Sequence, residues 1–159
     1  MITVAGCGGG DGGREPASTG QVVRGDGYVF SAPVDWKLTQ TPQGATLTPA
    51  SGGESLVSVT TFRLIRPFRP AAWSRAEDEL DGVADRLARQ LGGSVESRET
   101  FRAGVREYRL AYERKGMKLS QRIRFVLRAR REYELLCRWK TDDGEPDACG
   151  QLLASFRLS

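Results

Sequence analysis

The sequence has 159 residues, of which 28% are charged and 39% hydrophobic, and its formal net charge is +4. This is an ordinary globular composition for one domain and a short tail, and no run approaches the ~20 apolar residues of a membrane-spanning helix. The chain contains no histidine, which removes the commonest general base, histidine-dependent nucleophiles and most catalytic zinc sites.

The first residues, MITVAGCGGGDGG, contain the spacing G-x-G-x-x-G at Gly8, Gly10 and Gly13. In a dinucleotide-binding loop, a helix begins at the last glycine and its amides face the pyrophosphate. Here Pro16 and further glycines follow, without a helical apolar stripe or a βαβ repeat. We therefore expect no nucleotide cofactor.

The segment Val4 to Cys7, VAGC, resembles the lipobox of bacterial lipoproteins. The resemblance implies that the Cys7 thiol receives a diacylglyceryl group and that cleavage makes Cys7 the new N-terminus. Only six residues precede Cys7, without a basic residue or an apolar run of 7 to 15 residues, so residues 1–7 resemble a truncated signal and we expect the true start codon upstream. The alternative is an accidental VAGC in a cytosolic chain.

Residues 8–26 are rich in Gly, with Ser and Asp among the other residues, and have too little apolar surface to fold, which predicts a flexible tether. Residues 27–159 then form a single predicted domain. Tyr28–Ser31 and Trp36–Thr39 are predicted strands of a first hairpin, joined by a turn at Pro33–Asp35. Residues 44–49 and 56–65 are the next predicted strands.

A helix is predicted after the segment RPFRP, at residues 66–70. Ser74 and Glu77 have the spacing of a capping box, and Gly92–Gly93 end the pattern. Apolar residues recur between them with the helical period: Ala76, Leu80, Val83, Ala84, Leu87 and Leu91.

Four strands follow, at residues 95–104, 105–114, 117–127 and 131–140. Their apolar residues alternate with polar ones and the connections have hairpin length, which is typical of an antiparallel meander with one buried face. Arg122, Arg124 and Arg128 lie on the polar side, where we expect them to pair with Glu132 and Glu134 across strands.

The segment from Arg98 to Lys140 has a net charge of +9, which leaves −5 for the rest of the chain. Arginine outnumbers lysine 20 to 4, which the codon bias of a GC-rich genome would explain. The sharper interpretation is a basic face for an anionic lipid, polymer or nucleic acid.

Cys137 and Cys149 are separated by RWKTDDGEPDA, whose Asp-Gly and Glu-Pro turn signals let the chain fold back. We expect a disulfide between them in an oxidising compartment, contributing about 3 kcal/mol, and two buried free thiols in a cytosolic protein. Two distant cysteines without histidine do not complete a zinc site, so no metal is expected. Asp147 is the predicted cap of a final helix whose Leu152, Leu153 and Phe156 face inward.

The opening residues YVFSAPVDW, 28 to 36, and the closing C…C…LLASFRL resemble the PsbP-like α+β fold, which small actinobacterial lipoproteins of the LpqN type share. The resemblance implies an antiparallel meander with one long helix and a C-terminal helix packed on it. Tyr28, Phe30 and Trp36 would then be core aromatics. Members of this family mostly serve as binding or assembly accessories rather than enzymes, and no binding residue carries over.

These observations favour a lipid-anchored module on the extracytoplasmic face of the cell membrane, held to the bilayer through acylated Cys7. Its expected partner is an anionic headgroup, an anionic envelope polymer or a protein. Candidate contacts are Arg122, Arg124 and Arg128 on the sheet and Arg66 and Phe68 in the loop before the helix. The alternative for that loop is a stiff connector with Phe68 in the core.

Two other functions remain open at this point. A carboxylate-based hydrolase would use Asp142 and Asp143 or Glu132 and Glu134, but neither pair is predicted to lie in a pocket, so no catalytic residue is assigned. A cytosolic partner-binding or nucleic-acid-binding protein would use the arginine-rich sheet. The aromatic residues between those arginines are predicted to face the core, so a base-stacking platform is missing.

Overall fold

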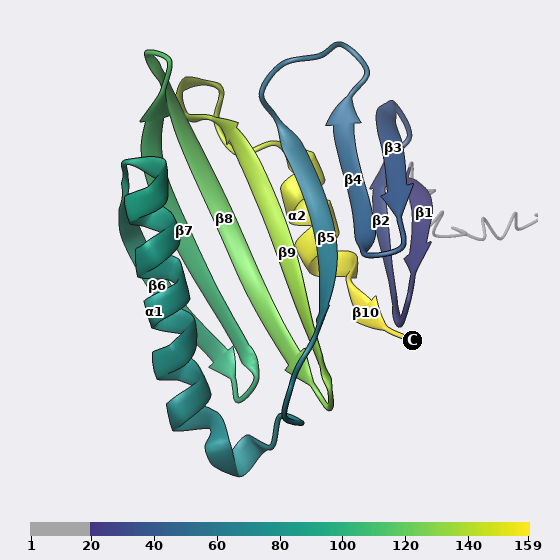
Figure 1. Ribbon diagram of the computed structural model, residues 1–159. Coiled ribbons are helices and arrows are strands. Elements are labelled where there is room, and N and C mark those ends of the chain that lie inside the picture. The colour runs from purple at the N-terminus through teal and green to yellow at the C-terminus, as the bar shows by residue number, and fades with distance from the viewer. Residues whose placement is uncertain (1–19) are drawn as a thin grey trace, which may run out of the picture.

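Two antiparallel sheets and two α-helices make up the chain in the computed structural model, which describes residues 20–159 (Figure 1). The larger sheet has seven strands and the smaller has three. This arrangement confirms the predicted α+β class. Cys7 and the VAGC segment lie outside the described residues.

The seven strands have the spatial order β3-β4-β5-β9-β8-β7-β6, with every described neighbour antiparallel. Their bounds in this order are Trp36–Thr41, Gly44–Pro49, Leu56–Arg63, Arg131–Lys140, Met117–Arg128, Val105–Arg114 and Ser94–Arg102. The predicted meander of β6 to β9 is confirmed. Strand β5, which precedes α1, pairs with β9, the last strand of the meander. The strands before and after the helix therefore belong to one sheet.

The smaller sheet consists of β1 (Gly20–Gly25), β2 (Tyr28–Pro33) and β10 (Arg157–Leu158), with β2 in the centre. The prediction of a tether reaching residue 26 was therefore wrong for β1. Val23 is the one side chain of β1 that is fully buried, at 1% exposure, and the remaining residues are Gly or surface residues. With only one buried apolar side chain, β1 has a composition that resembles that of a linker.

The predicted hairpin between the strands at Tyr28 and Trp36 was also wrong. Strand β2 pairs with β1 on one edge and, at Tyr28 and Val29, with β10 on the other, and it does not pair with β3. The turn at residues 34–35 instead carries the chain into the larger sheet, where β3 pairs with β4. Tyr28 and Phe30 are buried as predicted, and Trp36 packs at the edge of the same core.

Helix α1 (Trp73–Leu91) lies over β6 and β7 and buries Leu80, Ala84 and Ala88 (Figure 1). Gly92 ends it in the left-handed conformation at φ 71°, as the glycine pair predicted. The predicted capping box is absent, because a 3₁₀ turn (Pro70–Ala72) leads directly into the helix and Ser74 lies inside it.

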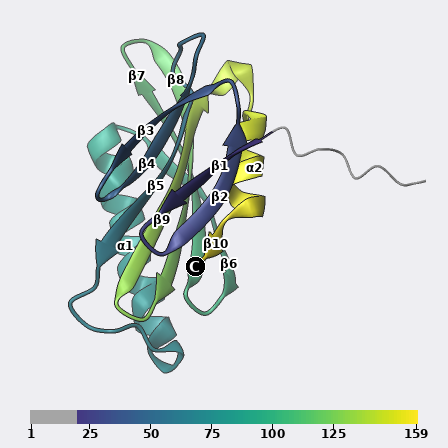
Figure 2. The same ribbon diagram turned by 90° about the vertical axis from the view of Figure 1, so that its right-hand side faces the viewer.

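Helix α2 (Asp147–Ser155) packs on the opposite side of the larger sheet from α1, together with the smaller sheet (Figure 2). Both faces therefore bury apolar residues, and the prediction of one buried face was wrong. The turn between β8 and β9 pairs Arg128 with Arg131 and hence Phe125 with Glu134. Directly paired residues share a face. The apolar side of β8 therefore faces α1, whereas the apolar side of β9 faces α2.

Candidate functional site

Most arginines between residues 98 and 140 form ion pairs with acids from other parts of the chain. Arg106 contacts Glu77 at 2.6 Å and Asp81 at 2.7 Å, and Arg114 contacts Glu54 at 3.0 Å. The basic segment and the acidic remainder of the sequence therefore neutralise each other in space to a large extent. A uniform basic face, as the charge distribution along the sequence predicted, is not formed.

Arg122 and Arg124 converge on Glu107, whose side chain is only 4% exposed. The shortest nitrogen–oxygen distances are 2.6 Å from Arg122 and 2.7 Å from Arg124. Arg122 also contacts Glu145 at 2.7 Å, in the loop between the two bridged cysteines. Both predicted binding residues are therefore held in a cluster on the α2 face of the sheet.

The predicted pairing of these arginines with Glu132 and Glu134 was wrong, because the two glutamates lie on the α1 face beside Phe125 and Leu127. Burial raises the pKa of both glutamates, and the charge of Glu134 adds to the effect at Glu132. Asp142 and Asp143 are exposed in a 3₁₀ turn. The structure brings neither carboxylate pair together with another reactive group, although Glu132 lines a groove of about 390 Å³ beside α1.

Asp81 on α1 joins the helix to the sheet. It accepts hydrogen bonds from Arg106 Nε at 2.7 Å and from the Tyr108 hydroxyl at 2.6 Å. Burial favours the neutral carboxyl, but these bonds and the arginine charges outweigh it and lower the pKa of Asp81. Burial and the bond to Asp81 raise the pKa of Tyr108. This network stabilises the docking of α1.

The loop before α1 is fixed against the β8–β9 turn. Phe68 N–H donates to Ala129 O at 2.7 Å, and its ring packs edge-on against Trp73 with centroids 6.2 Å apart. Phe68 is thus half-buried, which agrees better with the connector interpretation, while Arg66 is exposed and lines the same groove as Glu132.

The predicted disulfide is confirmed. Cys137 on β9 and Cys149 on α2 are bridged, with their Cα atoms 5.6 Å apart and both residues fully buried. The bridge fastens α2 to the central strand of the sheet, and the Arg122–Glu145 pair fastens the intervening loop to β8.

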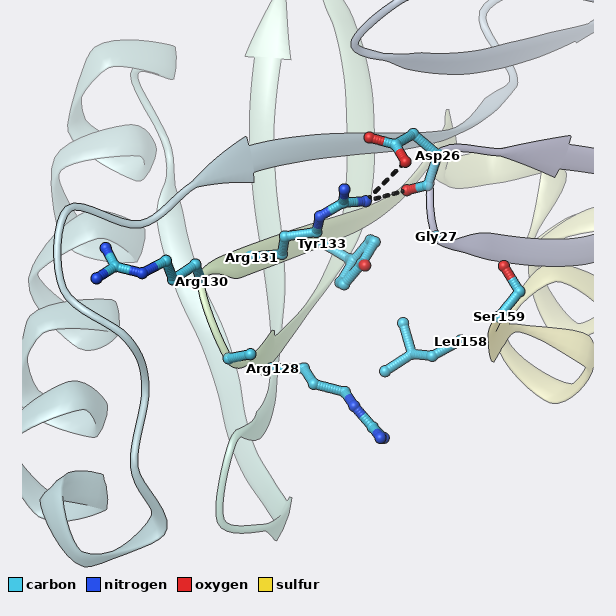
Figure 3. A pocket seen from close by; sticks show the side chains of 9 residues that line it. Asp26, Gly27, Arg128, Arg130, Arg131, Tyr133, Leu158 and Ser159 are labelled. Atoms are coloured by element: carbon cyan, nitrogen blue, oxygen red, sulfur yellow. Dashed lines mark hydrogen bonds and ion pairs between the residues drawn. The ribbon is translucent and has the colours of Figure 1, made fainter.

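A cavity of about 660 Å³ lies beside the β8–β9 turn, and Figure 3 shows the side chains around it. Arg131 contacts the Asp26 carboxylate at 2.9 Å. The side chain of Arg130 points away from both of these residues (Figure 3). Arg128 extends toward the side of the cavity where Leu158 lies (Figure 3). Among these three arginines, Arg128 is the one with neither an ion pair nor a hydrogen bond to residues 20–159.

Arg128 and Leu158 also line a neighbouring groove of about 400 Å³ on the α2 face, which we call the arginine groove. Every lining residue is either apolar or arginine: Phe101, Arg102, Val105, Arg124, Val126, Arg128, Leu135, Leu153, Phe156, Arg157 and Leu158. This groove is the strongest candidate for a binding site. It contains two of the three sheet arginines that the sequence predicted, Arg124 and Arg128.

The sequence did not indicate Arg102 and Arg157 as site residues. Arg102 ends β6 and Arg157 begins β10, in two sheets, and no local motif connects them. The alternation in FRLS, at residues 156–159, was the available signal, but the final strand was itself missed because Phe156 was placed in the helix.

The part of the chain that the structure describes contains no group of three or more Cys, Asp or Glu side chains arranged to hold a metal ion. No helix within residues 20–159 has the length and hydropathy to span a membrane.

Comparison with known proteins gives a fold but no closer relationship. No protein-family model matches the sequence, and no curated protein is significantly similar to it. The solution structure of the cyanobacterial PsbP protein CyanoP from Synechocystis is similar at a TM-score of 0.63 and 14% identity, over 95% of this chain and 98% of that one.

The crystal structure of LpqN from Mycobacterium tuberculosis, described as involved in cell envelope biogenesis, is similar at a TM-score of 0.56 and 18% identity, over 88% of this chain and 90% of that one. A protein from Bacteroides thetaiotaomicron matches at a TM-score of 0.53 and 9% identity over 83% of this chain, which spans only 45% of that protein's length. The chain thus has the PsbP-like fold that its opening and closing residues indicated.

Proposed function

We propose that this protein is a lipid-anchored extracytoplasmic module that binds a ligand or partner and does not catalyse a reaction. The observation that carries the location is the buried Cys137–Cys149 disulfide, because such bridges persist in oxidising compartments and are rare in the cytosol. The VAGC segment at Cys7 supplies the attachment, and a diacyl anchor has the two chains that stable membrane binding requires.

The similarity to LpqN, a protein of cell envelope biogenesis, supports the same location. The binding role is supported by the arginine groove, in which apolar and cationic side chains line one open cavity. No group in that cavity is a nucleophile or a general base at neutral pH, because arginine remains protonated.

The anchor is tested by growing the host with a labelled fatty acid and following its incorporation into the wild-type protein and a Cys7→Ser variant, both expressed from the gene's own chromosomal locus. We expect label in the wild-type protein and none in the variant, because the Cys7 thiol is the group that is acylated. Ser18→Ala, in the same N-terminal segment, is the matched control and should be labelled like wild type. A wild-type protein that takes up no label, or a Cys7→Ser variant labelled like wild type, would contradict the lipid anchor.

A further inference from the structure

We propose that the arginine groove binds a single-chain anionic amphiphile, a carboxylate on an alkyl chain. This deepens the binding role proposed above by naming the ligand class. The groove's volume of about 400 Å³ lies within the range of ~300–1,000 Å³ that small-molecule sites occupy. Its apolar side chains suit the alkyl chain of such a ligand, and its arginines suit the carboxylate.

The floor of the groove is apolar and partly open to solvent. Val105, Val126 and Leu135 are buried at 8%, 7% and 1% exposure, while Leu153 and Leu158, which line the same groove, are half-buried and supply its solvent-accessible apolar surface. An alkyl chain lying here would cover apolar area that water now contacts, which favours binding through the hydrophobic effect.

Two of the four arginines around the floor, Arg124 and Arg157, are positioned by contacts within the protein. Arg157 Nη1 donates to the carbonyl oxygens of Ala154 at 2.9 Å and Phe156 at 2.7 Å, so its guanidinium is fixed beside the C-terminal end of α2. Arg124 is held by Glu107 and lies over the Phe101 ring, 4.4 Å from its centroid. A fixed guanidinium loses less side-chain entropy when it binds an anion.

Two other arginines carry the uncompensated charge. Arg102 and Arg128 are exposed, and neither forms an ion pair with another described residue. Arg157 likewise has no carboxylate partner there, and its Nε and Nη2 groups make no hydrogen bond. A planar guanidinium matches a carboxylate in a bidentate geometry, so these three residues form a site for one anionic group.

The groove also discriminates against other ligands. It has no hydroxyl, amide or carboxylate side chain, so the hydroxyl groups of a sugar would find arginine donors but no side-chain acceptor for their own protons. A base-stacking nucleic-acid site is disfavoured because the groove has a single exposed ring, Phe101, and Arg124 already lies over one face of it.

Isothermal titration calorimetry tests the proposal on the full chain carrying Cys7→Ser, with the disulfide oxidised. The probes are decanoate below its micelle concentration, 1-decanol, which lacks the charge, and acetate, which lacks the chain. We expect the dissociation constant of decanoate to be at least ~10-fold lower than that of either partial probe, since a charge-assisted hydrogen bond contributes about a factor of ten or more. Equal affinity for decanoate and decanol would overturn the proposal.

The double variant Arg102→Gln/Arg128→Gln should raise the decanoate dissociation constant at least ~10-fold, and both residues are exposed, so folding should be unaffected. Arg130→Gln is the matched control, because Arg130 lies in the same turn and extends away from Arg128 (Figure 3). It should leave the constant within about twofold, because solvent and salt screen a charge that does not touch the ligand. Circular dichroism and thermal unfolding confirm that each variant is folded.

Sedimentation with phosphatidylglycerol vesicles separates a free amphiphile from a bilayer surface. Arginine-dependent vesicle binding without decanoate binding would overturn the proposal in favour of headgroup contact. The two proposals fail separately. Decanoate binding by a chain that is never acylated would contradict only the anchor, and an acylated chain that ignores decanoate would contradict only the ligand class.

Discussion

Single carboxylates, one buried and one half-buried, stabilise this fold where two elements meet. Glu107 is the clearest case, because it is nearly inaccessible and neutralises both Arg122 and Arg124. Asp81 plays the corresponding part between α1 and β7, through Arg106 and Tyr108. Arg122 and Arg124, which the sequence suggested as binding residues, are thus engaged in ion pairs within the fold. The arginines of the groove without a carboxylate partner among the described residues are Arg102, Arg128 and Arg157.

Replacing Glu107 with Gln tests how much these ion pairs contribute to stability. The change leaves two partly buried guanidinium groups without their shared counter-ion, and removing one partner of a buried pair costs about 3–5 kcal/mol. Because the two arginine side chains are 18% and 17% exposed, we expect about 2–3 kcal/mol in urea unfolding. Glu113→Gln, at an exposed position without a described partner, should change the free energy of unfolding by less than about 0.5 kcal/mol.

The pH dependence of stability should have opposite signs at Glu134 and Asp81. Burial raises the pKa of Glu134, so its contribution is favourable below the ordinary value of about 4.3 and is lost as pH rises through the folded-state pKa. The pKa of Asp81 is lowered, so its contribution is present above about 3.9 and is lost as pH falls through the folded-state value.

Thermal unfolding between pH 3 and pH 8 checks both signs. At pH 7, Glu134→Gln should raise Tm and Asp81→Asn should lower it, and the gain from Glu134→Gln should disappear below about pH 4. A fall in Tm for Glu134→Gln at neutral pH would show that the carboxylate has a stabilising partner.

At the scale of elements, the disulfide joins β9 to α2 and closes a loop that also holds Glu145. Replacing Cys137 and Cys149 together with Ala should reduce the free energy of unfolding by about 3 kcal/mol, the loop-closure contribution of a loop of this size. In a chain of this length this is a fall in Tm of roughly 6–12 °C. Wild-type protein treated with a reducing agent is the control and should unfold at a similarly lowered temperature.

The turn between β8 and β9 is strained, and it borders the arginine groove. Ala129 adopts φ 50°, a left-handed conformation that glycine adopts without steric cost. Ala129→Gly should therefore stabilise the protein by about 0.5–1 kcal/mol in chemical unfolding. Ala50→Gly is the contrast, because Ala50 has no positive φ, and it should be neutral or destabilising.

The sequence predicted elements well and their partners less well. The helix from Trp73 and the strands β4, β5, β7, β8 and β9 follow from apolar residues that each element buries on at least one side. Strand β6 has a weaker signal, because Val95 is its one residue that is not exposed. Strand β1 and the two-residue β10 contain too few apolar residues for that signal. Strand β2 pairs not with β3 but with β1 and, at Tyr28 and Val29, with β10 from the far end of the chain, a long-range contact that a local pattern does not indicate.

The faces of the sheet were predictable but were assigned wrongly. A two-residue turn at Ala129–Arg130 requires Arg128 to pair with Arg131, and this register places Phe125 opposite Glu134. Following the alternation of side chains from this turn back along β8 would have given a sheet with apolar residues on both faces. It would also have placed Arg124 and Arg128 on the α2 face. The groove itself could not be predicted, because it requires Arg102 and Arg157 from strands in different sheets.

At the scale of the whole molecule, a PsbP-like domain with a buried disulfide follows an N-terminal segment that contains VAGC at residues 4–7. Twelve residues separate Cys7 from Gly20, a length that could span about 40 Å when fully extended. With the proposed anchor at Cys7, the domain would stay within reach of amphiphiles that leave the same bilayer.

The most direct test of the lipid-anchored, extracytoplasmic module is the intact mass of the protein purified from membranes of its own host under thiol-blocking conditions. The account predicts a chain that begins at Cys7, carries the added mass of a diacylglyceryl group, and has Cys137 and Cys149 protected from the blocking reagent by their bridge. An unmodified Cys7 still preceded by Met1–Gly6, with both other cysteines labelled as free thiols, would contradict it.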